Sequence, residues 1–415
     1  MSLPFRLSRG VLNTISPPIP EAYAWAEKYD FSHGPLLDMA QGVPDRPPQQ
    51  ILREGLAIAS ASPDSFGYCP PRGELSLREA MVQEMRKVYG ENIDVTSDDM
   101  ALTSGCNLAF VATIMALADA GDEVILPVPW YFNLQMTLSM LNITTIPLQT
   151  RPEDGFVPSP SECKALITSK TKAIALVTPN NPTGATYPPE IIASFSHLAQ
   201  SHNIALILDE TYRDFIITTS LPPHFLFSNS TPPWRTHLIH LFSFSKSYAV
   251  PGHRLGLVAA SPLFLDSALL TVLDSLQICA PRPIQLALAP LLPALRLGII
   301  DTAADLAKRR ELFERHLPRG WKVGSIGGYF AFVRHPFRRG RGKGKGAKEV
   351  CRRLAEEMGV VLLPADFFTP DGEGENENEE RWIRFSVANC DERRILEVCQ
   401  RLEKCAALFG WESDA

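Results

Sequence analysis

Residues 243–256 read Ser-Phe-Ser-Lys-Ser-Tyr-Ala-Val-Pro-Gly-His-Arg-Leu-Gly. They follow the apolar run 238–242, which is typical of a buried strand. The single lysine of this stretch, Lys246, therefore comes directly after the end of a predicted strand. Ligands of open α/β sheets bind at the carboxyl ends of the strands, so the stretch predicts a ligand site at such an edge.

The side chains of this stretch suit a cofactor that carries both an aldehyde and a phosphate. Partial desolvation and nearby cations favour the neutral amine of Lys246, the form that condenses with an aldehyde. Ser243, Ser245 and Arg254 offer a phosphate two hydroxyl donors and a planar charged fork. An amine nucleophile beside such a cradle indicates pyridoxal 5′-phosphate (PLP) held as a Schiff base. The alternative is a surface lysine in a loop rich in serine and glycine.

The stretch resembles the lysine signature of the fold-type I PLP enzymes, specifically the class I/II aminotransferases. Further blocks resembling that family follow in family order over roughly residues 38 to 390, nearly the whole chain. The resemblance implies transfer of an amino group from an amino acid to a 2-oxo acid through the Schiff base at Lys246. It also implies a homodimer with shared active sites.

The apolar run 204–208 ends in a carboxylate, Asp209. A buried carboxylate needs a cationic partner, because leaving it unpaired costs several kcal/mol. A protonated pyridine ring would be such a partner and would keep the ring an electron sink. By resemblance, Tyr212 donates a hydrogen bond to the phenolic oxygen of the cofactor. The alternative for Asp209 is a helix N-cap after a turn between strand and helix.

A third apolar run, 173–177, leads into the turn Asn-Pro-Thr-Gly at residues 181–184, which resembles the family's Asn-Pro-x-Gly element. By resemblance, the Asn181 amide donates to the same phenolic oxygen as Tyr212 and also contacts the substrate. Two donors on that oxygen stabilise its anion and lower the pKa of the imine.

A second candidate for the phosphate site lies at Gly105, Cys106 and Asn107, just before an apolar helical stretch. Backbone amides at a helix N-terminus and the helix dipole attract an anion. By resemblance, the amides of these three residues bind the phosphate, and Tyr131 stacks on the cofactor ring. For Cys106, a reactive thiol is the alternative to a small packed residue.

The resemblance nominates three further residues. Tyr68 matches a tyrosine that reaches the phosphate of the neighbouring subunit, and this match is the reason to expect a dimer. Arg384, in a stretch that alternates like a strand, would clamp the substrate α-carboxylate as a bidentate arginine. Gly42 would offer its backbone amide to the same carboxylate. The sequence does not identify the side chain of the substrate, although it favours an apolar or aromatic one.

The length of 415 residues suggests two domains. Apolar runs alternate with helical stretches, which predicts an α/β fold with a mostly parallel central sheet. Residues 46–290 are predicted to form the large PLP-binding domain. Residues 1–45 and 291–415 are predicted to form a smaller α+β domain, with 326–333 as its first strand. The predicted strands of the large domain are 123–128, 172–178, 204–209, 238–244 and 255–260.

Composition limits the partners and the compartment. A net charge of −6 gives no electrostatic reason to expect nucleic acid. Eight cysteines without a Cys-x-x-Cys pair indicate neither a metal site nor a disulfide framework, and we expect a cytoplasmic enzyme. No run is expected to reach transmembrane length, so no membrane partner is predicted. The basic segment 338–348 and the acidic segment 371–380 are expected to be solvated loops without an assigned role.

Two other functions compete with transamination. A PLP-dependent lyase or carbon–carbon bond-forming enzyme of the same fold is the first, because one cofactor site supports several outcomes from the same carbanion. The second is the non-catalytic, aminotransferase-like sensor half of a transcription regulator. That interpretation needs a DNA-binding domain before the family fold, and the block around Gly42 begins too early to leave room for one.

Overall fold

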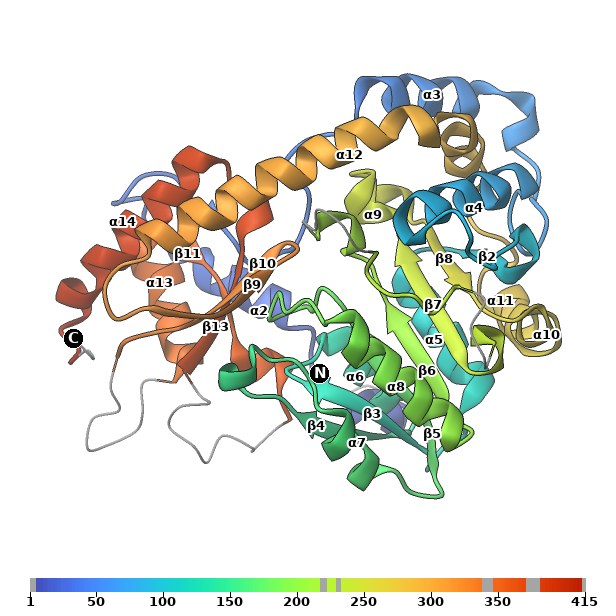
Figure 1. Ribbon diagram of the computed structural model, residues 1–415. Helices are drawn as coiled ribbons and strands as arrows, with labels where there is room; N and C mark the ends of the chain where they lie inside the picture. Colours follow the sequence, from blue (N-terminus) through green and yellow to red (C-terminus); the bar gives the residue numbers. More distant parts are fainter. Residues whose placement is uncertain (1–4, 217–221, 229–232, 338–345, 371–380, 413–415) are drawn as a thin grey trace.

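The computed structural model describes residues 5–216, 222–228, 233–337, 346–370 and 381–412. The basic residues 338–345 and the acidic residues 371–380 lie outside this set, so their predicted roles stay predictions. The described residues form three sheets, a large one of seven strands, a small one of four and a pair of short strands (Figure 1).

The large sheet has the strand order β2-β8-β7-β6-β5-β3-β4. Only β8 runs antiparallel to its neighbours, β2 and β7, and the other pairs are parallel. The predicted α/β class and each predicted strand of the large domain are therefore confirmed. The strands are β2 (Met100–Thr103), β3 (Glu123–Val128), β4 (Thr144–Gln149), β5 (Thr171–Val177), β6 (Ala205–Asp209), β7 (Leu238–Ser243) and β8 (Gly256–Ala259).

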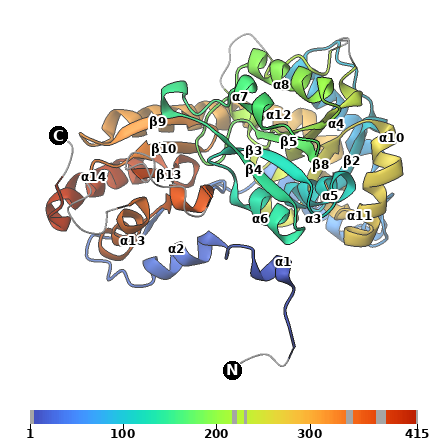
Figure 2. The ribbon, with the colours of Figure 1, turned by 90° about the horizontal axis from the view of Figure 1, so that it is seen from below.

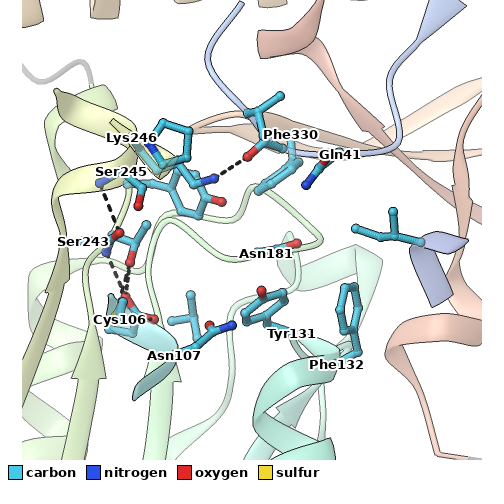
Figure 3. Close-up of a pocket in the computed structure, with 18 of the residues that line it drawn as sticks. Gln41, Cys106, Asn107, Tyr131, Phe132, Asn181, Ser243, Ser245, Lys246 and Phe330 are labelled. Carbon is cyan, nitrogen blue, oxygen red and sulfur yellow. Dashed lines mark hydrogen bonds between the residues drawn. The ribbon is translucent and has the colours of Figure 1, made fainter. Parts of the chain in front are cut away.

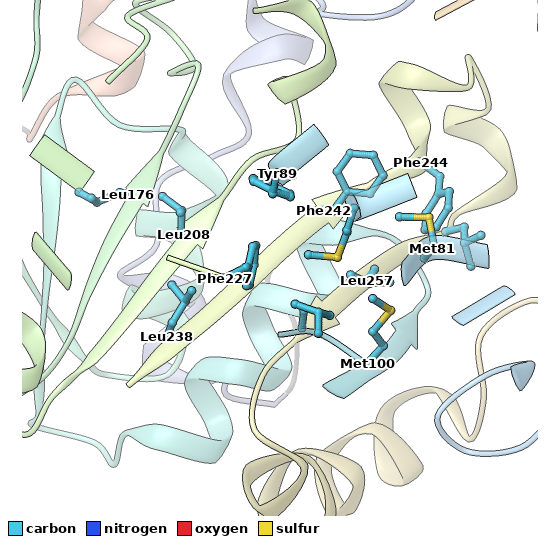
Figure 4. Packing of buried hydrophobic residues seen from close by; sticks show 14 of the residues in the cluster. Met81, Tyr89, Met100, Leu176, Leu208, Phe227, Leu238, Phe242, Phe244 and Leu257 are labelled. Atoms are coloured by element: carbon cyan, nitrogen blue, oxygen red, sulfur yellow. The ribbon is translucent and has the colours of Figure 1, made fainter. Parts of the chain in front are cut away.

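Helices cover both faces of this sheet, and each face has its own hydrophobic core. Figure 4 shows part of one core, in which Leu176, Leu208 and Leu238 follow one another across neighbouring strands. Strands buried on both faces read as continuous apolar runs, which is why they could be predicted. The helices of this part are α3 (Gln50–Ala61), α4 (Leu75–Tyr89), α5 (Cys106–Leu117), α6 (Phe132–Met140), α7 (Pro160–Leu166), α8 (Pro189–Ser201), α9 (Phe244–Ser247), α10 (Pro262–Phe264) and α11 (Leu270–Gln277).

The small sheet has the order β12-β13-β10-β9 and is antiparallel. The N-terminal strand β1 pairs with β11, which places Leu37 beside Val360. Helix α2 lies beside α13, as Figure 2 shows. The elements are α1 (Arg9–Leu12), α2 (Pro18–Ala26), β1 (Leu37–Asp38), β9 (Lys322–Gly327), β10 (Phe330–Arg334), α13 (Ala347–Met358), β11 (Val360–Val361), β12 (Leu363–Pro364), β13 (Trp382–Ser386) and α14 (Glu392–Phe409).

The predicted single strand 326–333 is wrong, because this stretch holds a hairpin. Strand β9 ends at Gly327 and β10 begins at Phe330, and the two pair antiparallel. Gly328 has φ +50, a left-handed conformation that glycine adopts without steric cost. Because apolar residues lie on both sides of the turn, the sequence pattern looked like one continuous strand.

Helix α12 (Arg282–His316) runs continuously from the large sheet to the small one (Figure 1). It packs against α3 and α4 at one end and against α14 at the other. The predicted domain boundary between residues 290 and 291 falls inside this helix, so the two parts share one rigid element there.

The same helix corrects the expectation that no run reaches transmembrane length. By length and composition alone, α12 qualifies, because it contains an 18-residue window with mean hydropathy 1.6. Of that window, 44% is buried inside the protein. A core helix passes the same test, so α12 is weak support for a membrane span.

Candidate active site

A cavity of about 230 Å³ lies at the carboxyl ends of β5, β6 and β7, and residues from α2 and from β10 and β13 of the small sheet also line it. Figure 3 shows Lys246, Tyr131 and Phe330 around it. Most of the residues predicted from the sequence line this cavity together. They are Gly42, Cys106, Asn107, Tyr131, Asn181, Asp209, Tyr212, Ser243, Ser245, Lys246, Arg254 and Arg384.

Lys246 projects into the cavity from the short helix α9, directly after β7. Its Nζ donates a hydrogen bond to the backbone carbonyl of Gly42. The family resemblance predicts a role for the backbone amide of Gly42, whereas this contact involves its carbonyl. Burial, followed by the charges of Arg384 and Arg254, lowers the pKa of Lys246 to about 8. Roughly a tenth of the amine is then neutral at pH 7, far more than for an exposed lysine.

Asp209 is the last residue of β6, and its two carboxylate oxygens have different hydrogen-bond partners. Its Oδ1 accepts hydrogen bonds from the backbone N–H of Thr211 at 2.9 Å and from the Thr211 hydroxyl at 2.6 Å. Its Oδ2 is 3.7 Å from the Cys106 thiol, a weak donor. Burial raises the pKa of Asp209, so its charged form calls for a cationic partner. A protonated pyridine nitrogen at Oδ2 fits this requirement.

The role of Thr211 as the partner of Asp209 was not predicted, although the spacing of the two residues in the sequence could have indicated it. An aspartate often hydrogen-bonds the backbone two residues on, and Asp209 and Thr211 have that spacing. Cys106 lies beside the same pair. Burial, and then the charge of Asp209, raises the pKa of the Cys106 thiol well above its usual value. This favours the small packed residue over the reactive thiol.

The candidate phosphate cradle forms at the start of α5. Gly105 precedes the helix with φ +91, and a Cβ at this position would clash with Nη2 of Arg254. Only glycine therefore lets the guanidinium approach the helix N-terminus this closely. Ser243 and Ser245 line the cavity on the same side, and the Ser243 hydroxyl accepts from the Ser245 N–H at 3.3 Å. A guanidinium, two serines and a helix N-terminus together suit a dianionic phosphate.

Gln277 supports this cradle from the end of α11. Its Oε1 accepts from the N–H of Ser104 at 2.7 Å, and its Nε2 donates to the carbonyl of Leu102 at 3.1 Å. Sequence reasoning missed Gln277, because 173 residues separate it from Ser104 and no local pattern connects them.

Arg384 enters the cavity from β13 of the small sheet and is only 2% exposed. Its Nη1 donates to Oδ1 of Asn181 at 2.8 Å, and its Nη2 donates to the carbonyl of Ala40. The guanidinium carbon lies 4.7 Å from the Phe330 ring centroid and 5.0 Å from that of Phe368. Burial lowers the pKa of Arg384 to about 10, so it stays charged at neutral pH.

Aromatic and aliphatic side chains form the remaining walls. The Tyr212 ring packs 5.3 Å from Phe330, and burial raises the pKa of Tyr212, so its hydroxyl stays a hydrogen-bond donor. The Tyr131 ring lies 5.0 Å from that of Phe132. Ile19 of α2 closes the wall from the N-terminal segment. Phe330 ends the stretch Gly327-Gly328-Tyr329-Phe330, which resembles a Gly-Gly-x-Phe block of the family and could have indicated it, whereas Ile19 carried no signal.

Gly105 and Tyr68 do not line the cavity. Gly105 supports it from behind, through its contact with Arg254. Tyr68 is 77% exposed and Phe66 is 80% exposed. The chain between them lies against Arg282, whose Nη1 would be 3.5 Å from a Cβ at Gly67.

Comparisons with known proteins agree with this geometry. The family model for aminotransferase class I and II matches residues 27–402. The aspartate aminotransferase of Thermotoga maritima is 27% identical over 370 residues, which cover 89% of this chain and 90% of that protein. The aromatic aminotransferase ISS1 of Arabidopsis thaliana is 28% identical over 379 residues, 89% of this chain and 89% of that protein.

Solved structures show the same fold. The crystal structure of the Thermotoga maritima aspartate aminotransferase superposes with a TM-score of 0.83 at 25% identity, over 97% of this chain and 100% of that one. The aspartate aminotransferase of Thermus thermophilus with maleate gives 0.82 at 24% identity, over 96% and 99%. These relatives are all aminotransferases, and none supports the lyase alternative. The chain belongs to the class I and II aminotransferases and is a PLP-dependent transferase of amino groups.

Proposed function

We propose that this aminotransferase acts on amino acids with apolar or aromatic side chains and uses Lys246 both to hold PLP and to move a proton. The observation that carries the proposal is the position of Lys246, whose amine enters a cavity that Asp209 and Arg384 also line and whose pKa is lowered to about 8. The apolar walls at Ile19, Phe132 and Phe330 support the substrate class.

PLP, when bound, supplies an electron sink for the electrons of the substrate α-carbon. The Asp209 carboxylate would hold the proton on the pyridine nitrogen, and its own position is fixed by Thr211. The Tyr212 hydroxyl and the Asn181 amide nitrogen would donate to the phenolic oxygen. Asn181 uses its carbonyl oxygen on Arg384, which leaves the nitrogen side of the amide for this contact.

Proton transfer falls to the Lys246 amine. With PLP and substrate bound, the free Lys246 amine would be the group that takes the proton from the substrate Cα and passes it on to the cofactor. Arg384 holds the substrate α-carboxylate, together with the backbone amide of Gly42. The amides at Gly105, Cys106 and Asn107, with Ser243, Ser245 and Arg254, would hold the phosphate, and Tyr131 would cover the ring.

Borohydride reduction tests the assignment of Lys246. The purified protein is expected to carry a chromophore at the edge of the visible range, and borohydride is expected to fix that chromophore covalently to Lys246. Peptide mapping by mass spectrometry identifies the modified residue. Lys246→Ala serves as the control and is expected to give no adduct. An adduct on another lysine, or none in the unaltered protein, contradicts the proposal.

We also propose a homodimer in which Tyr68 serves the phosphate site of the neighbouring subunit. Phe66 and Tyr68 are large aromatic residues separated by Gly67 in one loop, and both are mostly exposed, as expected of a surface that a second copy covers. Cys69, the next residue, is anchored by a contact of its thiol with the Ala280 carbonyl at 3.5 Å. The loop is therefore held in place while its rings face outward.

Hybrid dimers distinguish a shared site from a separate one. The Tyr68→Phe homodimer is expected to bind PLP roughly tenfold more weakly, because one hydrogen bond to a charged group is lost. In a hybrid of a Tyr68→Phe chain with a Lys246→Ala chain, the site with the intact lysine receives its tyrosine from the other chain. PLP affinity at that site, measured by chromophore titration, is then expected to be normal. Weakened binding there would place Tyr68 in its own subunit's site.

The same proposal places the enzyme in the cytoplasm. All eight cysteines are free, and six of them are buried. Thiols that stay unpaired in this number are typical of a reducing compartment.

A further inference from the structure

The turn that carries Lys246 is too short to hold itself in place. Helix α9 has four residues, and a helix of this length is not stable without tertiary contacts. Besides the bond from Lys246 Nζ to the Gly42 carbonyl, three hydrogen bonds join it to other parts of the chain. The Phe244 N–H donates to the Leu255 carbonyl at 3.2 Å, the Tyr329 hydroxyl donates to the Lys246 carbonyl at 3.3 Å, and the Ser247 hydroxyl donates to Oδ2 of Asp214 at 2.7 Å.

Asp214 connects this turn to two other elements. It lies in the 3-10 helix η4 (Arg213–Phe215), two residues beyond Tyr212. Its side chain is 2% exposed, and its Oδ1 accepts from Nη1 of Arg296 on α12 at 2.6 Å. One buried carboxylate thus joins the lysine turn, the segment that carries Tyr212 and the long helix α12.

The hydrogen bond between Ser247 and Asp214 matters most at the stage of the reaction in which the Lys246 amine is free. If Lys246 is joined to PLP, the covalent bond would fix the end of its side chain. When the amine is free, its position depends on the backbone of α9 and on the hydrogen bond from Nζ to the Gly42 carbonyl. Ser247 is the residue after Lys246, so its hydrogen bond acts on the position of that backbone.

We propose that the hydrogen bond from Ser247 to Asp214 positions the released Lys246 amine for proton transfer at the substrate Cα. Ser247 and Asp214 are positioning residues, because neither lines the active-site cavity. The inference rests on the role of Lys246 proposed above. It predicts that loss of the hydrogen bond slows proton transfer and leaves the binding of PLP and amino acid unchanged.

Ser247→Ala tests the inference, because it removes the hydroxyl and little else. A misplacement of about 1 Å can cost a rate factor of about 100, and the two remaining contacts limit the movement, so we expect kcat to fall about tenfold. KM and PLP content are expected to stay unchanged. With substrate deuterated at Cα, the isotope effect on the single-turnover rate is expected to rise, because the proton step becomes more rate-limiting.

Ser196→Ala is the matched control. Ser196 and Ser247 are both 8% exposed, and Ser196 also makes one side-chain hydrogen bond of 2.7 Å, to Nε2 of His237. It lies on α8, outside the cavity. A purely structural role for Ser247 would make the two variants alike, with lower melting temperatures and an unchanged isotope effect. That result, or an unchanged kcat in Ser247→Ala, would overturn the inference.

Two further measurements keep the test decisive. If Ser247→Ala does not fold, Ser247→Cys carries the same comparison, because a thiol is close in size and a weaker donor. Borohydride mapping of the same variant separates this inference from the role of Lys246. An adduct on Lys246 with an unchanged isotope effect refutes the positioning role alone, whereas an adduct on another lysine refutes both.

Discussion

Asp209→Asn is expected to lower kcat by roughly a hundredfold or more while Lys246 stays able to hold PLP. The neutral amide cannot stabilise a protonated pyridine nitrogen, so the ring loses most of its capacity to accept electrons. Removing one partner of a buried charge pair costs about 3–5 kcal/mol, which corresponds to this loss of rate. The Thr211 contacts at Oδ1 can persist in the variant, because an amide oxygen accepts hydrogen bonds too.

Single-turnover kinetics with an amino acid, followed by absorbance, measure this effect on the chemical step. Asp99→Asn is the control, since Asp99 is also buried and also pairs with a cation, Arg235, outside the cavity. The control is expected to lose stability and to keep its turnover when folded. Near-normal turnover in Asp209→Asn would reduce Asp209 to the partner of Thr211 in a local turn.

Arg384→Lys is expected to raise KM for the amino acid about tenfold to a hundredfold and to leave PLP affinity unchanged. Lysine keeps the charge but cannot reproduce the planar fork that binds a carboxylate with two hydrogen bonds. It also cannot span the contacts to Asn181 and Ala40 while reaching the substrate. A rise in KM larger than the fall in kcat would show that the lost interaction is mainly one of substrate binding.

Steady-state kinetics and PLP titration separate the two effects of this substitution. Arg401→Lys is its control, because Arg401 is 3% exposed and donates to the backbone carbonyl of Met358, away from the cavity. The control is expected to lose stability without a change in KM. If Arg384→Lys behaved in the same way, the carboxylate clamp would have to be sought elsewhere in the cavity.

Lys246 and Asp209 could be predicted from the residues themselves because they are placed by strand ends, whereas most other residues of the site were nominated by the resemblance to the family. Lys246 and Asp209 each follow an apolar run, and parallel strands buried on both faces give such runs. Once the strands are known, the residues after them must gather at one edge of the sheet. The chemistry of a buried lysine or carboxylate then restricts what each one can bind.

The tertiary structure alone decided the contacts that hold those residues in place. Ser247 meets Asp214 from a different turn, and Gln277 supports the backbone at Ser104 from a helix far along the chain. Sequence patterns report which face of an element is buried, but they do not report which distant polar group a side chain will meet. The positions of Asp209 at the end of β6 and of Lys246 just after β7 could therefore be predicted from local sequence patterns. The geometry between them was fixed only by long-range packing, for which the sequence carries no periodic signal.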